Sequence, residues 1–279
     1  MTPSGWPIHQ QVYDVFPSLR PLYFGFETEF DGQGASYWTG ETYLATLAVV
    51  LPAYIVFLVV GKAVMASRPG FSLKTPLFVW NAFLALFSLA GALRLVPHLG
   101  VTLYSRGLYF AVCSRPVDSY GLGASGLWTA LFIYSKIPEL IDTVFVVLRK
   151  KKLLFLHYYH HITVLAYCLH SYATRASPGL WFCALNLVVH SIMYSYYAFS
   201  SLGYRPPWAM AVTLCQIAQM VVGMSLAAAV GYYWSQDLPC HQDFNNLVAG
   251  LAMYASYFVL FMLFFIHRYV TSGSKDKRA

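Results

Sequence analysis

Charged side chains are scarce in this sequence. Only 10% of its 279 residues are Asp, Glu, Lys or Arg, and 58% are hydrophobic, whereas soluble globular domains are roughly 25% charged. A soluble protein of this size could not cover its surface with so few charges, so lipid is the natural solvent for most of that surface. The net charge of +7 does not favour nucleic acid as a partner, because the basic residues lie between apolar runs.

The sequence also lacks Gly/Ser linkers, internal repeats and low-complexity segments, so a single membrane domain is the simplest organisation. Its first 40 residues carry four carboxylates and therefore do not fit the basic start of a cleavable signal peptide. We expect an N-terminal segment over residues 1–40, a membrane domain over 41–270 and a tail over 271–279.

Long apolar runs dominate the remainder of the chain. Each run approaches or exceeds the roughly 20 residues that a helix needs to cross a bilayer. We therefore expect an all-α integral membrane protein with seven transmembrane helices, at about 43–66, 74–100, 126–148, 153–174, 179–200, 207–234 and 246–270.

Basic residues gather on one expected side of the membrane. Because cytosolic loops carry the excess of Lys and Arg, this side is expected to be cytosolic and the N-terminus lumenal. With seven crossings, the basic side receives Arg68, Lys74, Arg149, Lys150, Lys151, Lys152, Arg205, Arg268, Lys275, Lys277 and Arg278.

The last five residues, 275–279, read K-D-K-R-A. They match the K-x-K-x-x tail that returns membrane proteins to the endoplasmic reticulum, with Lys275 and Lys277 as the signal. An ordinary basic tail resting against anionic lipid is the alternative. We expect a multi-pass protein of the endoplasmic reticulum membrane with a cytosolic C-terminus.

Cysteine is sparse, with five residues in the chain. Cys168, Cys183 and Cys215 fall within expected spans and are interpreted as packing residues. Cys113 and Cys240 fall in two loops on the expected lumenal side, which is oxidising and favours disulfides. We predict a disulfide between Cys113 and Cys240; two free loop thiols are the alternative.

Ionisable residues inside apolar runs indicate function, because their burial in lipid is costly. The third expected span carries Lys136, Glu139, Asp142 and Thr143, with the charged groups roughly along one helical stripe. A buried ion-pair network that merely orders the bundle is one interpretation. The functional alternative is that Asp142 orients a catalytic imidazole.

Histidines mark the next two spans. His157, His160 and His161 lie within about one turn of the fourth span, and three imidazoles on one lipid-embedded helix are hard to explain by packing. His190 lies in the fifth span. Other polar residues share these faces, although Gln commonly just bonds helices together in membranes: Asn186, Tyr194 and Tyr197 in the fifth span, and Thr213, Gln216 and Gln219 in the sixth.

We expect these polar stripes to face one chamber that opens to the cytosol. The expected direction of each span places Asp142 and the fourth-span histidines in the cytosolic half, with His190 near mid-depth. The basic turn over 149–152 lies at the mouth, where its cations suit the phosphates of a nucleotide-like carrier. A pure orientation signal is the alternative for that turn.

The ordered set of motifs resembles the very-long-chain fatty acid elongase family, the 3-oxoacyl-CoA synthases of fatty acid elongation. The resemblance covers most of the chain from about residue 40. Glu139-Leu140 and the Y-H-H ending at 161 resemble the branch acting on saturated and monounsaturated acyl-CoAs, whereas Ile141 replaces the glycine common there. The family's motifs correspond to residues 136–143 (K-x-x-E-x-x-D-T), 157–161 (H-x-x-H-H), 186–197 (N-x-x-x-H-x-x-M-Y-x-Y-Y) and 216–219 (Q-x-x-Q).

The resemblance implies seven helices enclosing an acyl-CoA tunnel, and condensation of a long-chain acyl-CoA with malonyl-CoA. No cysteine accompanies an obvious base in the polar cluster, and imidazole can itself accept an acyl group. We expect His160 to be the nucleophile and His190 to assist decarboxylation or stabilise the enolate. His157, His161 and Asp142 are expected to fix ring geometry. The expected substrate-binding residues are Lys136, Glu139, Asn186, Tyr194, Tyr197, Gln216, Gln219, Arg149, Lys150, Lys151 and Lys152.

The resemblance implies no cofactor beyond the two CoA substrates and no metal. It implies as partners the bilayer and the 3-oxoacyl-CoA reductase, dehydratase and enoyl reductase of the elongation cycle, with homodimer formation left open. Two other classes stay open. A membrane di-iron desaturase or hydroxylase needs several histidine boxes, whereas one full box is present. A seven-span receptor or transporter would use the buried charges for binding or a proton relay.

Overall fold

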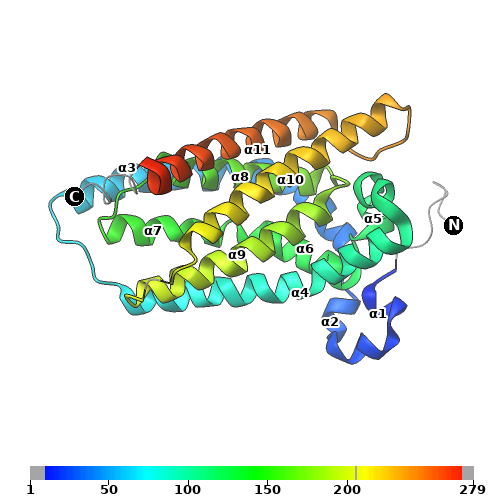
Figure 1. Cartoon of the computed structure of the whole chain (residues 1–279), viewed down its shortest axis with the longest axis horizontal. Coiled ribbons are helices and arrows are strands. Elements are labelled where there is room, and N and C mark those ends of the chain that lie inside the picture. The colour runs from blue at the N-terminus through cyan, green and yellow to red at the C-terminus, as the bar shows by residue number, and fades with distance from the viewer. Residues whose placement is uncertain (1–9, 205, 272–279) are drawn as a thin grey trace.

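A computed structural model describes residues 10–204 and 206–271, and these ranges form helices and connecting turns without any strand. Figure 1 shows the long helices lying side by side along one axis, with α1, α2 and α5 at the opposite end from the α9–α10 turn. Arg205, Lys275 and Lys277 lie outside the described residues. Within these described ranges, five helical stretches are long and apolar enough to cross a membrane: α3 (Gly32–Ala66), α4 (Lys74–Cys113), α9 (Gly179–Ser201), α10 (Ala209–Ser235) and Phe244–Thr271. The last of these joins α11 (Phe244–Phe265) to the π-helical turn η3 (Ile266–Thr271).

Two of the seven expected spans are not among these long apolar helices. One is α8 (Phe155–Ala173), which carries the histidines. The other is divided into α6 (Gly123–Ser135), the 3₁₀ turn η2 (Pro138–Leu140) and α7 (Ile141–Leu148). Pro138 explains the division, because proline has no N–H for the helix ladder and its ring clashes with the preceding turn. The expectation of one continuous helix over 126–148 was therefore wrong.

Other boundaries also differ from expectation. α3 begins at Gly32 rather than near 43, because the side chain of Asp31 accepts hydrogen bonds from the backbone N–H groups of Gln33 and Gly34 and caps the helix. α4 continues past 100 to Cys113, with a kink at Gly107, whose φ of 78° suits a residue without Cβ.

Apolar clusters fill the spaces between the long helices. Leu95 of α4, Leu165 of α8, and Leu180 and Leu187 of α9 are buried in one such cluster. A second cluster joins α10 and α11 through Met220, Met253, Tyr254 and Tyr257. Tyr257 also packs against His160, with ring centroids 5.1 Å apart, so this second cluster reaches the histidines.

The N-terminal segment is tied to the bundle by a buried ion pair. It comprises α1 (Val12–Val15), a 3₁₀ turn η1 (Pro17–Leu22) and α2 (Gly25–Thr28). The carboxylate of Glu27 accepts bonds from Arg94 Nε at 2.9 Å and Trp128 Nε1 at 2.7 Å. Burial alone would raise the pKa of Glu27, but these donors and the Phe24 N–H outweigh it and hold that pKa below its ordinary value.

Cys113 and Cys240 form the disulfide predicted from the sequence. It joins the end of α4 to the loop between α10 and α11. The remaining cysteines, Cys168, Cys183 and Cys215, are free, and the first two are buried among apolar side chains. The bridge closes a loop of 127 residues in sequence separation, so it constrains a large part of the unfolded chain.

Replacing both bridged cysteines by serine is expected to lower the free energy of unfolding by about 2–4 kcal/mol, because the unfolded chain regains the freedom that the bridge removes. Thermal unfolding of the purified protein with and without reductant measures this. Reductant should lower the unfolding temperature of the native sequence and leave the double variant unchanged. A native protein insensitive to strong reductant throughout its unfolding transition would contradict the prediction.

Candidate active site

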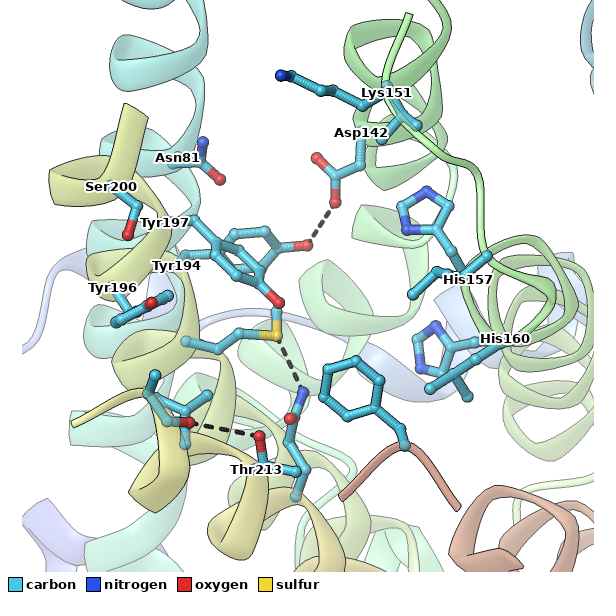
Figure 2. Close-up of a pocket in the computed structure, with 18 of the residues that line it drawn as sticks. Asn81, Asp142, Lys151, His157, His160, Tyr194, Tyr196, Tyr197, Ser200 and Thr213 are labelled. Atoms are coloured by element: carbon cyan, nitrogen blue, oxygen red, sulfur yellow. Dashed lines mark hydrogen bonds between the residues drawn. The ribbon is translucent and has the colours of Figure 1, made fainter. Parts of the chain in front are cut away.

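A cavity of about 640 Å³ lies at the end of the bundle where the turn over 149–152 is found. This volume falls within the range of small-molecule and cofactor sites. Figure 2 shows His157 and His160 projecting from α8 toward Tyr194 and Tyr197 of α9, with Asp142 and Lys151 above them. Side chains of α4, α7, α8, α9, α10, α11 and η3 contribute to the lining.

The cavity collects most of the residues that the sequence singled out. All five residues expected to be catalytic line it: His157, His160, His161, His190 and Asp142. Of those expected to bind substrate, the lining includes Glu139, Arg149, Lys151, Tyr194, Tyr197 and Gln216.

The other expected binding residues lie outside this lining. Lys136 and Asn186 lie behind Glu139, and Gln219 is buried one turn beyond Gln216. Lys150 turns away to donate hydrogen bonds to the carbonyls of Ala66 and Arg68. Lys152 is exposed.

The three α8 histidines form one cluster. The ring centroids of His157 and His161 are 4.6 Å apart, and those of His160 and His161 are 5.5 Å apart. Thr143 Oγ1 lies 2.9 Å from His157 Nε2 and is itself bonded to the hydroxyl of Tyr54 at 2.8 Å. These two hydrogen bonds hold the ring of His157 in place and fix which of its nitrogens is hydrogen-bonded.

Asp142 contacts a different set of donors from the one expected. Its carboxylate accepts bonds from Trp80 Nε1 at 2.6 Å and from the Tyr194 hydroxyl at 2.8 Å. Among the residues described, no imidazole bonds to it. Asp142 therefore reaches the histidines only through Tyr194, whose ring packs edge-on against His190 with centroids 5.3 Å apart. The residue that bonds a site imidazole directly is Thr143.

A buried ion pair between Lys136 and Glu139 lies at the wall of the cavity. Lys136 Nζ donates to both oxygens of Glu139, at 2.8 and 3.1 Å, and Ser135 Oγ donates to the same carboxylate at 2.8 Å. Lys136 also reaches Asn186 Oδ1 at 3.4 Å. The pair spans the break between α6 and η2, so it stabilises the geometry of that irregular segment.

The mouth of the cavity is positively charged. Arg149 and Lys151 of the turn over 149–152 line the cavity together with Arg268 of η3. The hydroxyl of Tyr269, which is also in η3, lies 3.5 Å from Thr213 Oγ1. π-helical turns are rare and are found frequently at functional sites. Three cations around one opening suit the phosphates of a carrier molecule.

The sequence interpretation missed several lining or supporting residues. Trp80 looks like any aromatic residue of an apolar helix, and Arg268 looks like part of a basic tail. Asn81 is a lone amide within the apolar run 74–100, and that polarity is the one signal that could have revealed it. Within residues 10–204 and 206–271, no three His, Cys, Asp or Glu side chains are grouped so that they could hold a metal ion.

Comparison with known proteins identifies close relatives over most of the chain. Residues 39–277 match the model of the ELO (GNS1/SUR4) family. The chain is 40% identical over 258 residues to very long chain fatty acid elongase 6 of Gallus gallus, covering 91% of this chain and 96% of that one. It is 39% identical over 258 residues to the Homo sapiens protein of the same name, with 92% and 96% covered. It is also 40% identical over 267 residues to putative fatty acid elongase 3 of Caenorhabditis elegans, with 92% and 82% covered.

Proposed function

This chain belongs to the ELO (GNS1/SUR4) family of very-long-chain fatty acid elongases, and from that membership we propose that it performs the condensing step of elongation. It joins a long-chain acyl-CoA to malonyl-CoA and yields 3-oxoacyl-CoA, carbon dioxide and CoA, without a metal or further cofactor. One observation carries the proposal. Imidazoles from α8 and α9 line a single cavity whose mouth is cationic.

His160 is the proposed nucleophile. Its ring lines the cavity, and neither ring nitrogen has a hydrogen-bond partner among the described residues, so a lone pair is free to attack. Attack on the thioester carbonyl forms a C–N bond and breaks the C–S bond. The proton of the imidazole leaves with the CoA thiolate, and an acyl-imidazole remains.

His190 serves the second half of the proposed reaction. Malonyl-CoA loses carbon dioxide, and the electron pair of the broken C–C bond becomes an enolate. The enolate carbon attacks the acyl carbonyl, the C–N bond breaks, and a proton from solvent returns to His160. A hydrogen bond from His190 to the enolate oxygen stabilises the charge as it develops.

The remaining polar residues position these groups. Thr143 and Tyr54 hold His157, and Asp142 and Trp80 hold Tyr194 against His190. Arg149, Lys151 and Arg268 bind the phosphates of CoA at the mouth. The acyl tail extends among the apolar side chains beyond the histidines, and each buried methylene contributes about 0.8 kcal/mol.

The membrane setting is part of the proposal. The chain crosses the endoplasmic reticulum membrane seven times, with residues 1–40 lumenal, the domain over 41–270 in the bilayer and the tail over 271–279 cytosolic. The cationic mouth then faces the soluble pool of CoA esters. The 3-oxoacyl-CoA product requires a reductase, a dehydratase and an enoyl reductase to complete one cycle.

The test is incubation of the purified chain with a long-chain acyl-CoA and no malonyl-CoA. We expect release of up to one equivalent of CoA and an acyl mass on the peptide that contains His160. His160→Ala should abolish both signals. His241→Ala, in a loop outside the cavity, should retain them. An adduct of unchanged yield in the His160→Ala protein would move the nucleophile to another residue.

A further inference from the structure

The end of the bundle that holds the reaction cavity carries more positive charge than the cavity uses. Segments 62–74 and 149–152 contain seven Lys and Arg residues and no carboxylate. None of the seven forms an ion pair with another residue that the structure describes. They are Lys62, Arg68, Lys74, Arg149, Lys150, Lys151 and Lys152.

A second, smaller pocket of about 190 Å³ lies among these cations, between the end of α3 and the turn that follows α7. Three lysines line it, Lys62, Lys150 and Lys151, and its apolar wall includes the buried side chains of Met65 and Val147. No acidic residue is part of the lining. A site that pairs several ammonium groups with an apolar wall suits an amphiphile with a negatively charged head.

Lys150 gives this pocket a fixed shape. Its backbone is left-handed, with φ of 51°, which is unusual for a residue with a Cβ and marks a position imposed by its surroundings. Its ammonium donates hydrogen bonds to the carbonyls of Ala66 and Arg68, at 3.1 and 3.0 Å, and so gives partners to carbonyl groups that the end of α3 leaves unbonded. Lys62 and Lys151 line the same pocket, and neither ammonium group has an ion-pair partner in the part of the chain that the structure describes.

The surface of α3 leads from the pocket into the lipid. Ile55 and Val59 are exposed on the same helical face as Lys62, and the helix is long and apolar enough to span the membrane. A lipid with its phosphate at Lys62 would lay its acyl chains along these two residues. Free phosphate would meet the lysines but leave the apolar surface unused.

We infer that the pocket between α3 and the α7–α8 turn binds the phosphate of an anionic bilayer phospholipid, held by Lys62 and Lys151. The two sites share Lys151, which the proposed function assigns to the phosphates of CoA, so the lipid site is distinguished by Lys62, which lines the smaller pocket and not the larger one. Lys151 lines both cavities, so a bound headgroup lies directly beside the mouth of the larger one.

The experiment uses the purified full-length chain in delipidated micelles, with native mass spectrometry to count the retained lipid. Phosphatidylserine should be retained in preference to phosphatidylcholine. Lys62→Gln should weaken the retention of phosphatidylserine by about fivefold, since one interfacial lysine contributes about 1 kcal/mol. Lys62→Arg should preserve it. Lys62 is exposed, so thermal unfolding in phosphatidylcholine should be the same for all three proteins.

Lys74→Gln is the matched control, because Lys74 lies at the same end of the molecule but outside the pocket lining. It should leave retention unchanged. An equal loss from Lys62→Gln and Lys74→Gln would show a diffuse charge effect and overturn the site. Displacement of the lipid by millimolar inorganic phosphate would also overturn it, because a site that needs only the phosphate would not be a lipid site.

Discussion

His190→Ala is expected to slow condensation on the order of 10³-fold while leaving transfer of the acyl group from acyl-CoA to the protein measurable. His190 and His160 come from different helices and line one cavity. If His160 accepts the acyl group and His190 acts on malonyl-CoA, the two half-reactions separate in the variant. The reason is that enolate stabilisation is needed only after the acyl-imidazole has formed.

Two signals distinguish the half-reactions. Release of CoA from acyl-CoA alone reports the first, and release of labelled carbon dioxide from malonyl-CoA reports the second. The His190→Ala protein should give a burst of CoA near that of the native protein and almost no carbon dioxide. His241→Ala should match the native protein in both. Equal loss of both signals in His190→Ala would mean that His190 serves the first step, and the assigned division of roles would be wrong.

The composition of the site could be predicted from the sequence because the bilayer makes polar residues conspicuous. His157, His160, His161, His190 and Gln216 stand out as polar groups within apolar runs, and helical spacing places them on shared faces. The structure brings all five into the lining of one cavity. The disulfide was also predictable, because Cys113 and Cys240 are the two cysteines that fall in loops on the same expected side of the membrane.

The contacts within the site could not be predicted in the same way, because they depend on a local break in the helix. Pro138 divides the third span, and this sets the direction of Asp142 and Thr143. Asp142 bonds to Trp80, which lies 62 residues away in sequence and carries no sign of that role. Such long-range partners are fixed by tertiary packing alone.

Lys136→Met is expected to destabilise the protein by about 3–5 kcal/mol, because it leaves the carboxylate of Glu139 buried without its counter-charge. The side chains of this pair are only 1% and 4% exposed. Ser135 would still donate one bond to Glu139, which cannot replace a full positive charge. Unfolding of the purified protein in a graded detergent or denaturant series measures the loss.

Arg115→Met is the matched comparison, because Arg115 and Asp118 form an ion pair with the same spacing along the chain. Asp118 is 4% exposed, as Glu139 is, but the Arg115 side chain is 41% exposed, so its removal admits water beside the Asp118 carboxylate and the expected cost is about 1 kcal/mol. The double variant Lys136→Met, Glu139→Leu should recover most of the loss, since neither charge is then left buried. If the double variant were no more stable than Lys136→Met alone, the loss would come from the cation–π contact of Lys136 Nζ with Phe132, 4.2 Å from the ring centroid, and not from the unpaired carboxylate of Glu139.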